Sequence, residues 1–426
     1  MNFLKKYYLF FLSVNVFLPK IDFGFGSFYV FDFVNILIFL ILISRGKIFV
    51  RSIVIQTYIL FMLIGFLTFF VGMLTFGFID TVSLVRLMKF LFFTSYMIIP
   101  FYIYRNVTLA DIKKVINFQI IFFIAAGAYV VVNMVSHPKK ITDYIWEYDN
   151  RYRLIGFTGY TINLHGHVEL TGSTSVSMGV FIAFIFFLCI ANYLYGQDRW
   201  GLVKALILHP LELLTYSRAG IVVLILGGIT YIFLNVRYKI LLKWLGAATA
   251  VVILGFSLNF FEKLSEFGTL GKVFKVSSRD DSSVNIRKNM LERGADYVFS
   301  HPYIIFTGSG YGEEYTLEAI SYPHLEGLMP TTLFTSGVVG VLVLTMHFFY
   351  LFKQSKTSIR QSSIPSYAYA LVLFVPGWFA SAIVAGNTFQ TDFLFPLVYF
   401  VFFCTYFKEK NRLSDDPIQP PILQAS

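Results

Sequence analysis

The sequence contains few charged side chains and almost no cysteine. Asp, Glu, Lys and Arg make up only 14% of its 426 residues, and there are two cysteines. Because soluble globular domains carry about 25% charged residues, the shortage of charge excludes an ordinary soluble enzyme. Cys189 and Cys404 both lie in apolar runs, which argues against a disulfide, a zinc site or a thiol nucleophile.

Long apolar runs dominate the chain instead. Hydrophobic residues make up 57% of it. One membrane-spanning helix needs about 20 apolar residues, so this content is sufficient for about a dozen spans. The runs are continuous rather than alternating, which disfavours an outer-membrane β-barrel. The predicted spans are 7–19, 28–44, 53–78, 81–104, 115–135, 172–195, 201–216, 219–236, 240–258, 328–352, 365–386 and 388–407.

Basic residues set the predicted orientation. The formal charge of +10 would suggest a nucleic-acid partner for a soluble protein, but Lys and Arg of a membrane protein collect on its cytoplasmic loops. With the N-terminus in the cytoplasm, each of the seven inner segments holds at least two Lys or Arg, and the short outer loops hold almost none. We therefore predict an all-α, multi-pass membrane protein with about 12 transmembrane helices, both termini in the cytoplasm and no nucleic-acid partner.

The predicted domain organisation is a single transmembrane domain over residues 1–407. Two long loops, 136–171 and 259–327, are expected on the periplasmic side. The tail 408–426 is polar and contains three prolines, and it is predicted to be a disordered cytoplasmic segment. Chemistry on the outer face is therefore expected in the two long loops, and above all in 259–327.

Ionisable residues within spans are costly in lipid and suggest function by default. Arg86 and Lys89 are three residues apart on one helix face near the outer end of their span, and they repel unless an anion or a carboxylate lies between them. They either extend to the lipid headgroups or bind phosphate. Asp32 is interpreted as the partner of such a cation, and Glu212 as a residue that packs helices or orients Arg218.

Arg218 follows Ser217 between two apolar runs at the predicted outer surface. There is no room for a loop, so its guanidinium is expected to lie along the membrane interface. The planar fork of Arg donates two parallel hydrogen bonds to phosphate and stays charged. Arg218 is therefore a candidate phosphate-binding residue, and the alternative is a turn anchored by an interfacial arginine.

The second outer loop has a helical pattern followed by a glycine-rich turn. Apolar residues recur at helical spacing over 284–300, and His301-Pro302 is expected to end that helix. Gly308, Gly310 and Gly312 allow close approach of backbone to a ligand. The Gly-Lys-Ser/Thr of a nucleotide-binding loop is absent, so ATP binding is rejected.

Two further residues of this loop are candidate bases. His324 and Glu326 are expected at the outer surface, just before the span that begins near residue 328. A lone histidine is usually structural, but one that faces two arginines is a candidate general base. His165 and His167 with Glu169 are weak evidence for a metal, and Asp280-Asp281 is typical of a solvated turn, so neither a metal nor a cofactor is predicted.

Four motifs occur in order on the predicted outer side. They are Ser217-Arg218-Ala219-Gly220; Arg287 through His301-Pro302 with Gly308, Gly310 and Gly312; His324 with Gly337-Val338-Val339-Gly340; and Arg153-Leu154-Ile155-Gly156-Phe157. This pattern resembles the O-antigen ligase and polymerase family of bacterial inner-membrane glycosyltransferases. In ligases of that family the histidine is followed by Asn, Ser or Gln. Here Leu325 follows, and in ungapped register Glu326 occupies the histidine position, which favours a polymerase over a ligase.

The resemblance implies a GT-C-like fold in the bacterial inner membrane, with the active site on the periplasmic face. The implied donor is a glycan on undecaprenyl diphosphate, and the acceptor is a lipid-linked repeat unit or lipid A core. In this interpretation Arg218 and Arg287 stabilise the departing diphosphate without a metal, and His324 or Glu326 deprotonates the acceptor. The other implied substrate-binding residues are Arg153, Arg293, Arg86, Lys89 and the three glycines.

A chain-length regulator is a further implied partner, besides the lipid bilayer. A transporter of lipid-linked glycans is the remaining alternative. Transporters often show repeated halves, and no internal repeat is visible in this sequence, so transport is disfavoured.

Overall fold

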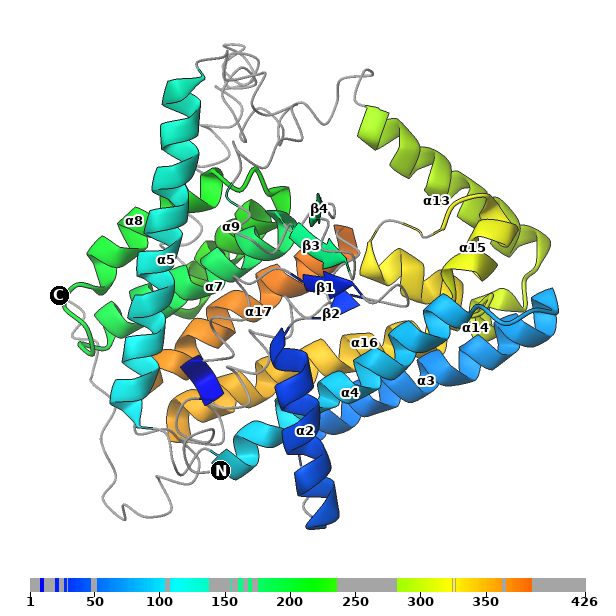
Figure 1. The fold of residues 1–426 in the computed structure, drawn as a ribbon, viewed down its shortest axis with the longest axis horizontal. Helices are drawn as coiled ribbons and strands as arrows, with labels where there is room; N and C mark the ends of the chain where they lie inside the picture. Colours follow the sequence, from blue (N-terminus) through cyan, green and yellow to red (C-terminus); the bar gives the residue numbers. More distant parts are fainter. Residues whose placement is uncertain are drawn as a thin grey trace.

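The computed structural model describes residues 8–10, 20–22, 27–28, 30–46, 52–103, 108–137, 154, 160–163, 168–170, 175–235, 282–323, 325, 327–361 and 365–384. This part of the chain is predominantly helical, as expected (Figure 1). The helices are α2 (Val30–Ser44), α3 (Ile53–Phe76), α4 (Thr81–Ile103), α5 (Leu109–Ser136), α7 (Ser175–Leu194), α8 (Gly201–Leu213), α9 (Arg218–Asn235), α13 (Ser282–Ser300), α14 (Ile304–Thr307), α15 (Glu313–Ile320), α16 (Leu328–Gln361) and α17 (Pro365–Val384).

Several of these helices are suited to a membrane. Among the described residues, five are long and apolar enough to cross one: Ile53–Phe76, Ala110–Ser136, Arg218–Asn235, Leu328–Arg360 and Pro365–Ile383. Two shorter apolar helices cover Phe31–Ser44 and Met178–Leu194. The predicted break between 201–216 and 219–236 is confirmed by the separate helices α8 and α9. The predicted spans 240–258 and 388–407, and most of 7–19, lie outside the described residues.

The core is built around α7 and α17. Helix α17 packs against α9, α16 and α7, and α7 also packs against α8 and α9. Both helices are apolar on all sides, which is typical of helices enclosed by others. Phe184 of α7 and Phe374 of α17 meet edge to face with ring centroids 5.0 Å apart, and Trp378 stacks on Phe374.

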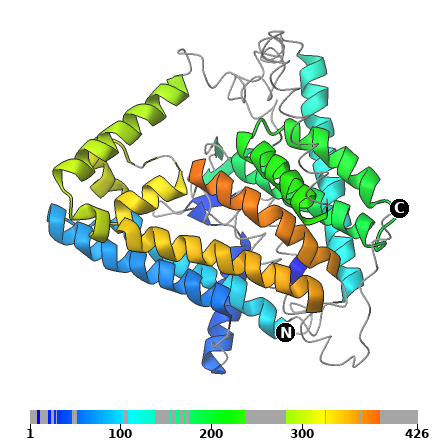
Figure 2. The same ribbon diagram turned by 180° about the vertical axis from the view of Figure 1, so that it is seen from behind.

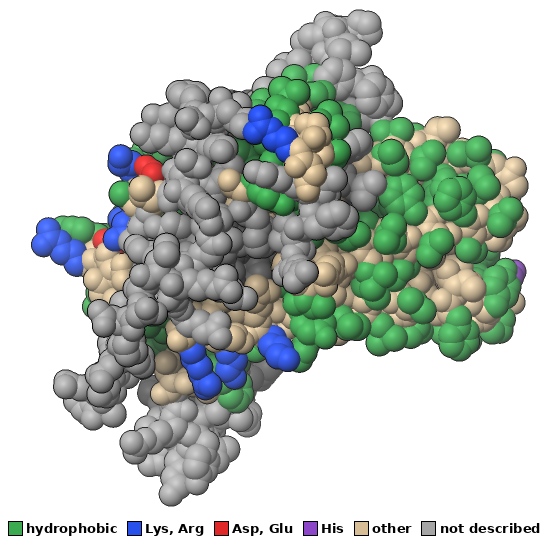
Figure 3. Space-filling view, turned by 90° about the horizontal axis from the view of Figure 1, so that it is seen from below, with side chains coloured by type: hydrophobic (Ala, Val, Ile, Leu, Met, Phe, Trp, Pro, Cys, Tyr) green, Lys and Arg blue, Asp and Glu red, His purple; other side chains and the backbone are tan. Residues whose placement is uncertain are grey.

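The outer surface of the bundle is apolar where it is expected to face lipid. Leu67 and Leu74 of α3 are 66% and 79% exposed, and Val135 of α5 is 74% exposed. Figure 3 shows hydrophobic side chains across much of the described surface, with Lys and Arg gathered elsewhere. A soluble protein rarely exposes an apolar area of this extent, so these helices are suited to a lipid environment.

The structure adds a small sheet that the sequence analysis did not predict. It comprises β1 (Lys20–Asp22), β2 (Ser27–Phe28), β3 (Tyr160–Asn163) and β4 (Val168–Leu170), in the order β2-β1-β3-β4. Strands β1 and β3 are parallel, with Ile21 opposite Ile162, and the other two pairs are antiparallel. The sheet therefore joins the segment before α2 to the predicted first outer loop. Strands of two to four residues are too short for alternation of polar and apolar residues to reveal them.

Candidate functional site

The turn between α8 and α9 is held by a chain of local hydrogen bonds. Thr215 Oγ1 donates to the Glu212 carbonyl at 2.7 Å and accepts from the Ser217 N–H at 3.1 Å. Ser217 Oγ then accepts from the Gly220 N–H at 3.2 Å, so it caps the N-terminus of α9. Tyr216 has a φ of 52°, which a bulky residue adopts only when its surroundings fix it. The turn thus fixes the backbone at the start of α9, where Arg218 lies.

Glu212 is the most unusual side chain near this turn. It is 1% exposed, and within the described part of the chain neither carboxylate oxygen has a hydrogen-bond partner. A Cβ at Gly220 would come within 2.3 Å of Glu212 Oε1, so the carboxylate packs directly against α9. The predicted packing role is therefore consistent with the structure. A buried carboxylate without a partner is costly, which suggests a role beyond packing.

The predicted helix over 284–300 is confirmed as α13. It ends at Ser300, and His301-Pro302 follows it as predicted. Its polar residue Arg293 donates to the Ile320 carbonyl at 3.4 Å, and its guanidinium lies 5.4 Å from the centre of the Tyr322 ring. Helix α13 is thereby tied to the end of α15. Arg293 makes structural contacts, and its predicted assisting role stays a prediction.

The glycine-rich turn packs against two helices. Helix α16 is interrupted at Gly337 (φ 64°, ψ −170°), and the turn donates to carbonyls just before that break. The Ser309 N–H donates to the Phe334 carbonyl at 2.8 Å, and the Gly310 N–H to the Thr335 carbonyl at 3.2 Å. The turn therefore supplies donors at the place where the helix loses its regular hydrogen bonding.

The glycines of this turn closely approach the protein itself. A Cβ at Gly308 would lie 2.2 Å from the Thr335 carbonyl oxygen, and one at Gly310 would lie 2.3 Å from the Gly72 Cα of α3. Gly308 and Gly310 also have φ values of 74° and 114°, which favour glycine. A Cβ at Gly312 would meet the Tyr315 ring at 2.5 Å. Packing alone therefore accounts for the three glycines, and their binding of a ligand stays a prediction.

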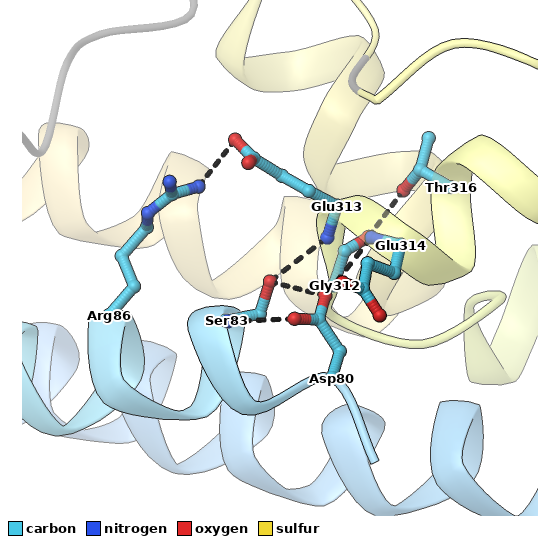
Figure 4. A network of polar contacts seen from close by, with 7 residues as sticks. All are labelled: Asp80, Ser83, Arg86, Gly312, Glu313, Glu314 and Thr316. Atoms are coloured by element: carbon cyan, nitrogen blue, oxygen red, sulfur yellow. Dashed lines mark hydrogen bonds and ion pairs between the residues drawn. The ribbon is translucent and has the colours of Figure 1, made fainter. Parts of the chain in front are cut away.

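Asp80 joins the N-termini of two helices. Its Oδ1 accepts from the Ser83 N–H of α4 at 2.9 Å, and its Oδ2 accepts from the Glu314 N–H of α15 at 3.0 Å. Ser83 Oγ donates to Asp80 Oδ2 at 2.6 Å and accepts from the Glu313 N–H at 3.0 Å (Figure 4). Carboxylates are favourable at helix N-termini. One buried carboxylate therefore holds the N-terminus of α15 against the start of α4.

Tyr315 completes this attachment. Its ring is buried and stacks on Phe76 with centroids 5.6 Å apart. Its hydroxyl donates to the Phe78 carbonyl at 3.0 Å and accepts from the Asp80 N–H at 3.2 Å. Burial raises the pKa of this hydroxyl, so it stays a neutral donor near neutral pH.

Arg86 lies one helical turn beyond Ser83 and forms an ion pair with Glu313 (Figure 4). Arg86 and Lys89 were expected to need a carboxylate or an anion nearby. Glu313 of α15 is the carboxylate that pairs with Arg86. The two side chains are 39% and 41% exposed, so water and ligands can reach both. Lys89 is on the same helix, but its side chain lies outside the described residues.

The structure describes only some of the predicted site. His324, Glu326 and Arg153 lie outside the described residues, as does the side chain of Arg287. Helix α13, which carries Arg287, packs against α15 and α16, whereas α9 packs against α7 and α17. In Figures 1 and 2 α13 lies on the opposite side of the molecule from α8 and α9. The predicted meeting of Arg218 and Arg287 around one substrate stays a prediction.

Asp80, Ser83 and Glu313 are contacts of this region that the sequence pattern did not predict. Asp80 immediately before a helical run is a recognisable N-cap signal, but its second partner on α15 is more than 230 residues away. Asp32, interpreted as the partner of a cation, is buried and accepts a hydrogen bond from the Tyr96 hydroxyl. Within the described ranges no group of three or more His, Cys, Asp or Glu could hold a metal ion.

A comparison with known families identifies this region. Residues 211–335 match the O-antigen ligase family, which confirms the relationship predicted from the motifs. The matched segment contains Glu212, Arg218, α13 and the glycine-rich turn. A search of curated proteins gives no match. The match covers less than a third of the chain and relates this segment to membrane glycosyltransferases of the ligase or polymerase type.

Proposed function

We propose that the protein is a surface-polysaccharide polymerase of the O-antigen type, with its active site on the periplasmic face of the inner membrane. The observation that carries the proposal is the family match over 211–335, the segment that holds Arg218 and Arg287. The departure from the ligase pattern at Leu325 and Glu326 favours a polymerase over a ligase.

The proposed reaction joins two lipid-linked repeat units. The acceptor hydroxyl attacks the anomeric carbon of the donor glycan, the bond from that carbon to the diphosphate oxygen breaks, and the lipid diphosphate leaves with the bonding electron pair. His324 or Glu326 takes the proton of the attacking hydroxyl. Negative charge grows on the leaving group in the transition state, so fixed cations lower the barrier without a metal. Arg218 and Arg287 are the proposed cations, with Arg153 and Arg293 assisting.

One feature of the structure supports the proposal for Arg218. The Thr215–Ser217 hydrogen bonds fix the backbone from which it extends. A cation that is already held in place needs little reorganisation when charge develops in the substrate.

Arg86 is a further proposed contact for the substrate, because its guanidinium is partly exposed and already binds a carboxylate.

The ligase alternative differs only in the acceptor, so one experiment separates the two. Purified protein in lipid nanodiscs is incubated with a defined lipid-diphosphate repeat unit, alone and with lipid A core. A ladder of products from the donor alone supports the polymerase. Product that forms only when core is added supports the ligase. Movement of the donor across a bilayer without any new glycosidic bond would favour the transporter and refute both.

A further inference from the structure

A polar cavity lies at the end of α8 that is distant from the Arg218 turn. Its volume is about 200 Å³, and its polar lining comes from Lys113 of α5, the loop after α7 and Lys204 of α8. Helix α8 has 13 residues, which corresponds to about 20 Å at 1.5 Å per residue. The cavity is therefore separate from the candidate active site and lies toward the other end of the helices.

The lining of this cavity carries one net positive charge. Lys113 and Lys204 contribute +2 and Asp198 contributes −1, so the sum is 2 − 1 = +1. Burial alone would raise the pKa of Asp198, but the hydrogen bond from Lys204 and the charges of both lysines lower it below its usual range. Asp198 is therefore ionised near neutral pH, and the cavity is suited to a ligand with one negative charge.

Among the described residues, the two ammonium groups have fewer partners than donors. Lys204 Nζ donates to Asp198 Oδ2 at 2.5 Å and to Asn117 Oδ1 at 2.8 Å, and Lys113 Nζ donates to the Gln197 carbonyl at 3.1 Å. Each ammonium has three N–H donors, so six donors minus these three bonds leaves three. The side-chain amides of Asn117 and Gln197 add uncharged donors and acceptors to the same cavity.

The cavity lies at the level expected for lipid headgroups. Lys113 is five residues into α5 and Lys204 four residues into α8, so both lie where apolar helices begin. Trp200 is 57% exposed, with the Arg199 guanidinium 5.8 Å from the centre of its ring, and Tyr193 is 44% exposed. Exposed Trp and Tyr beside Arg are typical of the membrane–water interface.

We propose that this cavity binds the headgroup of an anionic glycerophospholipid with a hydroxylated headgroup, of the phosphatidylglycerol type. One phosphodiester charge neutralises the net charge of the lining, and the three remaining ammonium donors suit its oxygens. The amides of Asn117 and Gln197 suit glycerol hydroxyls. An ethanolamine headgroup fits less well, because its ammonium would lie beside Lys113 and Lys204. Basic pockets between membrane helices recognise anionic headgroups by the same chemistry.

Native mass spectrometry of the full chain released from nanodiscs tests the proposal. Nanodiscs of phosphatidylcholine contain a minor share of either phosphatidylglycerol or phosphatidylethanolamine. We expect retention of phosphatidylglycerol and a higher thermal midpoint with it than with the other two lipids. Lys113→Gln should weaken retention about fivefold. One Lys near an anionic membrane surface contributes about 1 kcal/mol of binding free energy, and about 1.4 kcal/mol corresponds to a tenfold change in affinity.

The matched control is Lys114→Gln, because Lys114 is the exposed neighbour of Lys113 and does not line the cavity. It should retain phosphatidylglycerol as the wild type does. Equal retention of the three lipids, or equal losses in Lys113→Gln and Lys114→Gln, would overturn the proposal. Glycerol phosphate added to phosphatidylcholine nanodiscs separates the two sources of this chemistry. A full thermal shift from this soluble compound alone would overturn the assignment to a lipid.

Discussion

Replacement of Asp80 by alanine should weaken the attachment of α15 to the start of α4. The substitution removes the acceptor of the Ser83 and Glu314 N–H groups, at 2.9 and 3.0 Å, and of the Ser83 hydroxyl. Loss of an N-cap costs about 1 kcal/mol, and a buried N–H left without an acceptor costs about 1–3 kcal/mol. Two helices lose an acceptor, but the cost of losing a cap and the cost of an N–H without an acceptor describe partly the same interaction and are not simply added. We expect about 2–4 kcal/mol less stability for the docked state of α15.

Hydrogen exchange of the amides in α15 measures this docked state directly. A loss of about 2–4 kcal/mol corresponds to exchange roughly 30- to 700-fold faster. Asp111→Ala is the matched control, because Asp111 is the N3 residue of the capping box at the start of α5 and is partly exposed. It should accelerate exchange at the start of α5 by about fivefold and leave α15 unchanged. Unchanged exchange of α15 in Asp80→Ala, or equal acceleration there in both variants, would refute the reasoning.

Three further substitutions, one of them with a control variant, test other contacts of the structure. Arg86→Gln should destabilise the docked state of α15 by only about 0–1 kcal/mol, because its ion pair with Glu313 is partly exposed. A larger loss of stability, measured as faster hydrogen exchange of the α15 amides, would contradict this. Gly310→Ala should lower the thermal midpoint, because its Cβ would lie 2.3 Å from the Gly72 Cα and its φ is 114°. Its control, Gly228→Ala, should be neutral or stabilising, because a Cβ there meets no described side chain or neighbouring helix within 4 Å. Glu212→Leu should raise the thermal midpoint, because it removes a buried carboxylate without a described hydrogen-bond partner. It should also lower the rate of glycan transfer. A variant that is both more stable and fully active would show that Glu212 has no functional role.

The long helices could be predicted from the sequence because their signals are local, whereas the short helices α14 and α15 were not predicted. The spacing of apolar residues over 284–300 and the His301-Pro302 stop are sufficient to define α13. Ser217-Arg218 between two apolar runs likewise predicts the break between α8 and α9, which the structure confirms. In each case the pattern depends on residues within one or two helical turns.

Long-range contacts could not be predicted in the same way. The pairing of β1 with β3 joins residues about 140 positions apart, and Asp80 meets α15 across more than 230. The glycine-rich turn shows the same limit. Its glycines predict that the backbone approaches another group closely, but they do not predict which group. The structure shows that Gly308 and Gly310 approach α16 and α3, where the sequence analysis expected a ligand.

The measurement that tests the central claim most directly is single turnover of a lipid-diphosphate repeat unit by wild type, Arg218→Gln and Arg287→Gln. Removal of one group that stabilises developing charge typically slows the chemical step by about 100- to 1000-fold. We therefore expect glycosidic bond formation to slow by about that factor in each variant, with unchanged thermal midpoints. Wild-type rates in both variants would contradict the account, because the departing diphosphate would then not depend on these guanidinium groups.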